Sequence, residues 1–163
     1  MSKLGKRTDQ RMAMLKNQVS ELLWYGQIET TVDRAKAVRS LAEKYITIAM
    51  RAYQDDVKVT KTVADAKGAK KEVVFTNDGP KKLAARRRLM AELVDLQEIK
   101  GEKESKSAFR ARIKDTKHPL IEKMFKEYAP KYDARKNELG QGGGYTRILK
   151  TGTRRGDARN LHS

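Results

Sequence analysis

The residues best suited to chemistry gather in the glycine-rich, basic segment 142–157, GGGYTRILKTGTRRGD. Its glycines let the backbone adopt positive φ angles or lie close against another surface. Gly152 and Gly156 bracket Arg154 and Arg155, so that a tight turn would present two guanidiniums beside outward-facing backbone amides, an arrangement that binds phosphates. The chemistry indicated is the binding of a polyanion. A glycine-rich loop that leads into an ordinary basic edge strand explains the same residues equally well.

Catalytic and metal-binding patterns are missing from the sequence. The two histidines, His118 and His162, have no other histidine at ligand spacing, so we predict no metal site. Residues 140–145 nearly spell a dinucleotide fingerprint, but Tyr145 stands where the last glycine is needed and a strand-like run follows where a helix is required. The carboxylates are spaced among lysines as on a solvated surface, and no acid/base pair stands out. We therefore predict neither an enzyme nor a cofactor, and no small-molecule substrate.

The positive charge of the chain is evenly distributed. The net charge is +16 at pH 7, with 37 Lys and Arg against 21 Asp and Glu. Residues 1–54 carry 10 basic and 5 acidic residues, residues 55–117 carry 17 and 11, and residues 118–163 carry 10 and 5, which gives +5, +6 and +5. A neutral domain with a basic tail would not show this distribution. A surface that contacts a polyanion in many places would, because phosphate neutralisation dominates nucleic-acid affinity.

The composition also predicts the setting of the protein. The 163 residues fit a single domain, 1–163. The absence of cysteine fits a reducing cytoplasm, and no uncharged run approaches the roughly 18 residues of a membrane span. We expect a cytoplasmic protein that does not bind membranes.

Two amphipathic helices are predicted in the first third of the chain. The first begins at Thr8 or Asp9 and ends at Gly26. A short strand is expected at residues 27–31, and the second helix follows from about residue 31 to 52. Its buried face is predicted to consist of Ala35, Val38, Leu41, Tyr45, Ile48 and Ala52. Cations crowd its first two turns against the helix dipole, so that an external anion would be favourable there.

Three further segments are predicted in the middle of the chain. Alternation on both sides of Gly68 predicts a protruding β-hairpin insertion at 54–76. A helix capped by Asn77 or Asp78 should run over residues 80–99, with a buried side made of Leu83, Met90, Leu93, Val94 and Leu96. The mixed-charge segment 97–117 is expected to be an inserted linker or weak helix.

The last third should contain one helix and one strand. The helix opens at Pro119 and is expected to end at Pro130, with residues 131–141 as a link. The run 145–150, YTRILK, has the composition of a strand.

Two blocks of the sequence carry motifs that are specific when they occur together. The first contains KLGKRTDQRMAMLKN and IETTVDRAKAVRSLAEKYITIAMR, and the second is GGGYTRILKTGTRRGDAR. In these blocks, which cover about residues 3–53 and 118–159, the chain resembles the bacterial large-subunit ribosomal protein L17 family. The resemblance implies an α+β fold with helices packed on a small sheet in which the IETT and YTRILK strands take part. The β-hairpin insertion and the basic terminal arms are predicted from the residues themselves.

The resemblance also implies a function. Members of this family bind large-subunit ribosomal RNA near the exit of the peptide tunnel, beside other ribosomal proteins. The chain departs from the family pattern in its short arm, in Lys6 where an arginine is usual, and in ending soon after Asp157, which suggests that a C-terminal edge strand is missing. The contacts of the insertions at 54–76 and 97–117 do not follow from the resemblance.

Together, these observations predict a non-catalytic, RNA-binding constituent of the large ribosomal subunit. A free-standing nucleic-acid-binding or RNA-chaperone protein is the alternative, which differs in that it would not co-sediment with large subunits at one copy each. The residues predicted to contact RNA are Lys3, Lys6, Arg7, Arg11, Arg34, Lys36, Arg39, Gly143, Gly144, Tyr145, Arg147, Lys150, Arg154 and Arg155.

Overall fold

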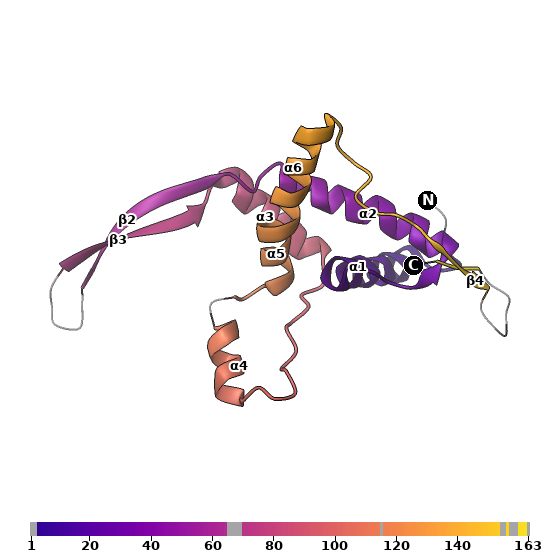
Figure 1. Ribbon diagram of the computed structural model, residues 1–163, viewed down its shortest axis with the longest axis horizontal. Helices are drawn as coiled ribbons and strands as arrows, with labels where there is room; N and C mark the ends of the chain where they lie inside the picture. The colour runs from indigo at the N-terminus through magenta and orange to yellow at the C-terminus, as the bar shows by residue number, and fades with distance from the viewer. Residues whose placement is uncertain (1–2, 65–69, 115, 154–155, 157–159, 163) are drawn as a thin grey trace.

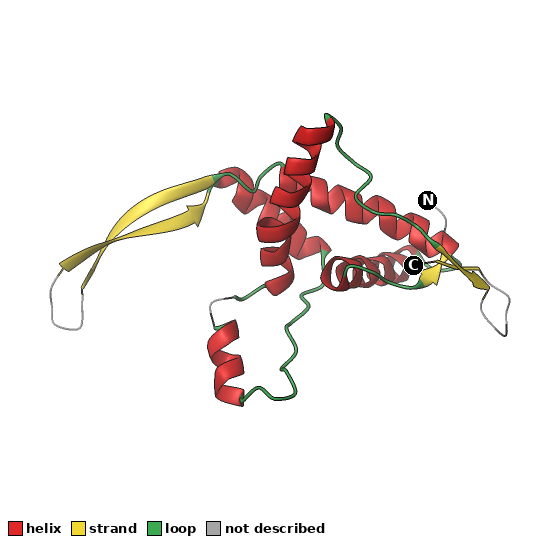
Figure 2. Ribbon diagram, in the orientation of Figure 1, coloured by secondary structure: helices red, strands yellow, loops and turns green. Residues whose placement is uncertain are grey.

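The computed structural model describes residues 3–64, 70–114, 116–153, 156 and 160–162 (Figure 1). Helices form the body, a two-stranded hairpin extends from one side of it, and a small sheet lies at the opposite end (Figure 2). The fold is α+β, as the sequence predicts.

Helix α1 (Thr8–Tyr25) follows the predicted bounds. Leu15, Val19 and Leu23 recur at steps of four and are buried in the core. Gly26 ends the helix in the left-handed conformation, with φ of 84°, and its N–H donates to the carbonyl of Leu22 at 2.9 Å.

Helix α2 (Val32–Met50) lies where it is predicted, but its buried face is rotated from the predicted one. Val38 and Tyr45 are buried as expected, whereas Ala35, Leu41 and Ile48 are only partly buried. The residues that complete the buried face are Ala37, Ala42, Ile46, Ala49 and Met50. Three of these are alanines, and small side chains let a neighbouring helix approach closely, which apolar spacing alone does not reveal.

Helix α3 (Pro80–Glu92) is shorter than predicted, and the predicted buried side is confirmed at Leu93, the residue that follows it, but not at Leu83, Met90 or Val94. Ala85, Leu89 and Leu93 face the core, while Met90 and Val94 are about 40% exposed, as is Leu83. The helix is not capped by Asn77 or Asp78. Instead, the Asp55 carboxylate, from before the hairpin, accepts the amides of Lys81 at 2.7 Å and Lys82 at 3.3 Å. Long-range capping of this kind cannot be seen in the local sequence.

The helix predicted to end at Pro130 continues through it. Helices α5 (Pro119–Lys123), η1 (Met124–Tyr128) and α6 (Ala129–Leu139) follow one another without a break, so residues 131–139 are helical rather than a link. The η1 segment is a π-helix, in which the amide of Ala129 donates to the carbonyl of Met124. A π-turn just before the proline accommodates its missing N–H and its ring, which is how the helix avoids the expected break.

The small sheet has the strand order β1-β5-β4, with antiparallel pairs. Strand β1 (Thr30–Thr31) confirms the IETT strand. The strand predicted at 145–150 is wrong in its extent, because β4 (Lys150–Thr153) begins only at Lys150. The expectation of a missing C-terminal strand is also wrong, since β5 (Asn160–His162) pairs with both other strands.

Both insertions have structure. Strands β2 (Asp56–Ala64) and β3 (Lys70–Asp78) form the predicted hairpin, and the turn with Gly68 lies outside the described residues. Helix α4 (Lys106–Ile113) is the weak helix expected within 97–117, and its N-cap Ser105 accepts the amide of Ala108 at 3.1 Å. None of the helices in the described ranges is long and apolar enough to cross a membrane.

Candidate nucleic-acid interface

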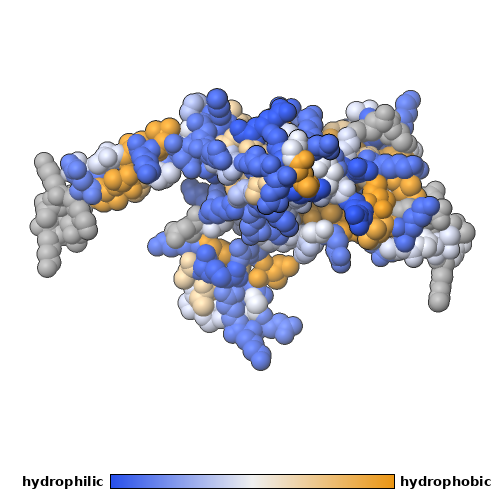
Figure 3. All heavy atoms as spheres, turned by 45° about the horizontal axis from the view of Figure 1, so that its top comes forward, coloured by the Kyte–Doolittle hydropathy of each residue, from blue (hydrophilic) through white to orange (hydrophobic). Residues whose placement is uncertain are grey.

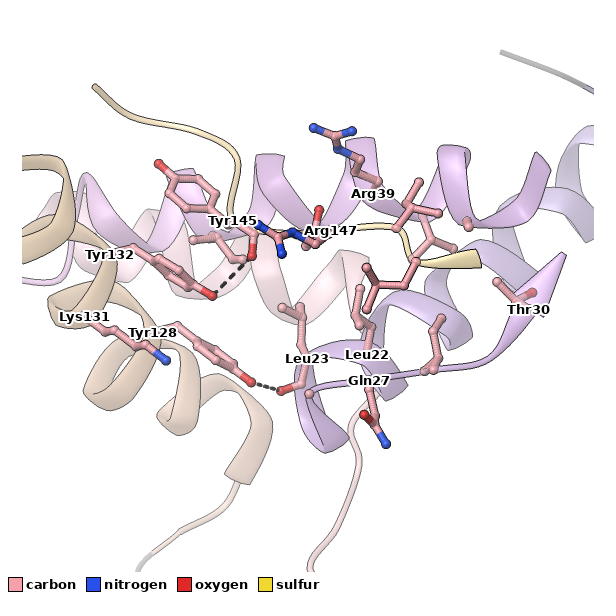
Figure 4. A pocket seen from close by; sticks show the side chains of 18 residues that line it. Leu22, Leu23, Gln27, Thr30, Arg39, Tyr128, Lys131, Tyr132, Tyr145 and Arg147 are labelled. Atoms are coloured by element: carbon pink, nitrogen blue, oxygen red, sulfur yellow. Dashed lines mark hydrogen bonds between the residues drawn. The ribbon is translucent and has the colours of Figure 1, made fainter. Parts of the chain in front are cut away.

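Residues 142–149, here called the strap, cross the surface of the helical body between the end of α6 and strand β4 (Figures 1 and 4). Side chains of two helices hold it. Thr146 donates its hydroxyl to Glu43 of α2 at 3.0 Å, and Arg135 of α6 donates to the carbonyl of Gly144 at 3.3 Å. Tyr132 donates to the carbonyl of Tyr145 at 3.4 Å. The strap is therefore attached to the body, although it has no strand pairing of its own.

Tyr145 is the aromatic residue of the strap that the sequence assigns to RNA contact. Its ring lies 4.7 Å from that of Tyr132, which in turn stacks on Tyr128 at 6.1 Å (Figure 4). Burial raises the pKa of Tyr128 and of Tyr132, so both hydroxyls stay protonated as donors at neutral pH. Tyr128 donates to the carbonyl of Leu23 at 2.8 Å. This tyrosine row fixes the strap to α1 and α6.

The glycines of the strap are explained by backbone conformation. Gly143 has φ of 98° and Gly144 has φ of 63°, which a residue with a side chain adopts only with strain. A Cβ at either position would meet no described atom within 4 Å. A turn with two residues of positive φ therefore accounts for both glycines, and close approach of RNA is not needed to explain them.

Two hollows with cations in their lining adjoin the strap. A cavity of about 460 Å³ between α1, α2, η1, α6 and the strap is lined mainly by apolar residues, with Arg39, Lys131 and Arg147 among its lining (Figure 4). A shallower hollow of about 440 Å³, which shares Tyr145 with the first, holds Lys44, Arg51 and Arg88 beside Gly143. Among the residues that line the two hollows, one carries a carboxylate, and that residue is Glu43. Positive charge from three helices therefore converges on the strap.

The structure brings together some of the predicted contact residues. Gly143, Tyr145 and Arg147 share the strap, and Arg39 reaches the same place from α2, where its Nε donates to Glu43 at 3.2 Å. Lys36 is exposed near the start of α2, Arg34 is half-buried there, and Lys150 is exposed at the start of β4.

The N-terminal arm is a separate basic region. Lys3, Lys6 and Arg7 are exposed, and Arg7 pairs with Asp9 at 3.5 Å. Arg11 is half-buried on α1. Leu4 packs against the core and anchors the arm. Arg154 and Arg155 lie outside the described residues, so the terminal basic loop remains a prediction.

Sequence reasoning missed Lys44, Arg51, Arg88 and Lys131 as members of this interface. A partial signal exists for two of them, because Lys44 and Arg51 continue the helical face of α2 on which Lys36 lies. For Arg88 and Lys131 no local signal exists, since they reach the strap only through the packing of α3 and α6 on α2.

Arg86 lies on α3 close to Arg88 in the sequence, but it has a structural role. Its guanidinium forms ion pairs with Asp78 at the end of β3 and with Glu122 of α5, the latter at 2.6 Å, and lies 5.2 Å from the Phe125 ring centre. Burial alone would raise the pKa values of Asp78 and Glu122, but the bonds from Arg86, helped by Lys82 and Lys126, lower both. This cation is therefore not available to an external anion.

Comparison with known proteins decides what kind of molecule carries this surface. The family model described as Ribosomal protein L17 matches residues 14–162. The chain belongs to the ribosomal protein L17 family. Members of this family are structural proteins rather than enzymes, as the sequence predicts.

Curated relatives match this chain over nearly its whole length. A protein of Lachnospira eligens called large ribosomal subunit protein bL17 is 38% identical over 96% of this chain and 92% of its own. Proteins of the same name from Clostridium acetobutylicum and Acetivibrio thermocellus are 36% and 35% identical, each over 98% of this chain and over 90% and 94% of their own.

The described part of the chain offers no cluster of three or more His, Cys, Asp or Glu side chains that could hold a metal ion.

Proposed function

We propose that this protein is a structural constituent of the large ribosomal subunit and that it binds large-subunit ribosomal RNA. Its relatives carry the name of a large-subunit protein over nearly the full length of the chain. By the resemblance, its place is near the exit of the peptide tunnel, beside other ribosomal proteins, within the ribosome of the cytoplasm. The RNA-contacting regions are the N-terminal arm, the outward face of α2 with the strap, and the terminal basic loop.

The observation that carries RNA binding is the charge around the strap. Six cations line the two hollows against one carboxylate, Glu43. Cations gathered around one segment repel one another, and phosphates that bind among them remove that cost and release counterions. The strap is also held by hydrogen bonds to α2 and α6, so its cation, Arg147, is positioned before RNA arrives.

The test replaces two of these cations that belong to different elements. Arg88→Gln combined with Arg147→Gln should weaken binding to large-subunit ribosomal RNA at low salt. The slope of log K against log salt should become shallower by roughly 1.4–1.8, since each lost phosphate contact removes about 0.7–0.9. The control is Lys106→Gln with Arg110→Gln, two exposed cations of α4, which should leave the slope nearly unchanged.

Sedimentation separates this function from the alternative. The wild-type protein should co-sediment with large subunits at one copy each, whereas an RNA chaperone would remain mostly free. An equal loss of slope in the α4 control would show that binding follows total charge rather than the strap.

A further inference from the structure

The β2–β3 hairpin presents two chemically different faces. Its register pairs Val57 with Asn77, Val59 with Phe75, Lys61 with Val73 and Val63 with Lys71, and residues paired directly across an antiparallel ladder lie on one side of it. The apolar members of this side, here called the valine face, are Val57, Val59, Val63, Val73 and Phe75. The opposite side carries Lys58, Glu72 and threonines, with Val74 as its large apolar residue.

The valine face is open to solvent. Val57 is 45% exposed, Val63 44% and Phe75 40%, and the hairpin extends away from the helical body (Figures 1 and 3). An apolar patch of this kind on a protrusion marks an interaction site. A two-stranded hairpin is also only marginally stable in water on its own, so a partner on this face would supply burial that the chain itself does not.

The root of the hairpin fixes the direction in which this face points. Lys82 of α3 pairs with Asp56 at 2.6 Å and with Asp78 at 3.6 Å, and Arg86 also pairs with Asp78. Both strands are thus tied to α3 where they leave the body. The face is presented in a defined direction rather than on a free tether.

The chemistry of the valine face suits protein rather than RNA. Valine side chains offer neither a charge to phosphate nor a ring on which a base can stack. The aromatic ring of the face, Phe75, already has the Lys61 ammonium 5.7 Å from its centre. Lys61 and, by its register opposite Val63, Lys71 are the charged residues of this side, so a complementary surface is apolar with carboxylates opposite them.

We propose that the valine face is the docking surface for a second protein of the ribosomal particle, one that presents an apolar surface with a carboxylate at its rim. The inference rests on the proposed function, because that function places both proteins in one particle. It assigns the hairpin to protein contact, while the strap and the α2 face contact RNA.

Photo-cross-linking within assembled large subunits tests this assignment. The full-length chain carries p-benzoylphenylalanine in place of either Val57, on the valine face, or Val74, on the opposite face. Val74 is the more exposed of the two, at 60%, so undirected reaction would favour it. We expect residue 57 to form a cross-link to protein, resistant to nuclease, at several times the yield of residue 74.

A second measurement replaces apolar residues of the valine face by threonine, which is itself a strand-forming residue. Val63→Thr with Phe75→Thr should increase release of the protein from large subunits in a high-salt wash at least threefold relative to Val74→Thr, because salt screens phosphate contacts but not apolar ones. Nuclease-sensitive cross-links from residue 57, or yields no greater than those from residue 74, would overturn the inference. Wild-type protein that fails to co-sediment with large subunits would instead overturn the proposed function.

Discussion

Replacing Arg86 by methionine removes the group that joins three elements of the body. The Arg86 guanidinium bonds both carboxylate oxygens of Asp78 at the end of β3 and donates to Glu122 of α5 at 2.6 Å. The side chains of Arg86, Asp78 and Glu122 are 19%, 20% and 25% exposed. Methionine keeps the unbranched stem that packs beside Phe125, so the main change is the loss of charge and hydrogen bonds.

The size of the effect follows from this burial. Removing one partner of a fully buried ion pair costs about 3–5 kcal/mol, because the remaining charge is left without compensation. Here two carboxylates lose their partner, but water reaches each of them and Lys82 and Lys126 stay nearby. We therefore expect a loss of about 2–3 kcal/mol at pH 7, which lowers the melting temperature by roughly 4–12 °C for a domain of this size.

The pH dependence identifies the cause. The folded-state pKa values of Asp78 and Glu122 are lowered, so their contribution to stability is fully present above the unfolded values, near pH 4, and is lost as pH falls through the folded values. In Arg86→Met this contribution is absent, and burial then raises the pKa of each carboxyl. The difference between wild type and variant should be largest at neutral pH and shrink on acidification from about pH 5 to pH 3.

Urea unfolding at a series of pH values measures this difference. Arg87→Met is the control, because Arg87 is the exposed neighbour of Arg86 on the same helix and its replacement should change stability by less than about 0.5 kcal/mol. A destabilisation of Arg86→Met that is the same at pH 3.5 and pH 7 would refute the reasoning, since it would come from packing on Phe125 rather than from charge.

Two further predictions concern the strap and the hairpin. Gly144→Ala should destabilise the isolated protein by about 1 kcal/mol in urea unfolding, because the φ of Gly144 is 63°. The RNA affinity of the folded fraction should be unchanged. Unchanged stability with weaker binding would instead indicate close approach of RNA. Deleting residues 57–77 and closing the gap with two glycines should lower the melting temperature by less than about 8 °C. Asp55 is kept and continues to cap α3. Asp56 and Asp78 are also kept and continue to pair with Lys82 and Arg86. A larger fall would show that the hairpin stabilises the body.

Much of the fold could be predicted from the sequence because its signals are local. Apolar spacing and Gly26 define α1, and alternation defines the hairpin. The failures have two physical origins. Asp55 caps α3 across the hairpin, which is a contact between distant segments that the residues beside α3 do not reveal. The π-turn that carries the chain helically through Pro130 is local, but proline normally ends a helix, so the sequence favours a break there.

The candidate interface was only partly predictable for the same reason. Arg39 and Arg147 stand out as cations within recognisable motifs, and the structure brings them to one place although 108 positions separate them in the chain. Arg88 and Lys131 have ordinary helical surroundings in sequence. Their membership depends on how α3 and α6 pack on α2, which only the folded structure establishes.

Strand β5, which the sequence reading left out, bears on the proposed binding of RNA. β5 is three residues long, too short for alternation to reveal it, and yet it lies between β1, beside the start of α2, and β4, which follows the strap. The strap is therefore fixed at both ends, by the sheet at Lys150 and by α6, whose C-cap is Gly140 with φ of 65°. A loop fixed in this way loses less conformational entropy when it binds than a free loop of equal charge would. Under the proposed function, pairing through β5 therefore contributes to RNA affinity at residues that β5 does not touch.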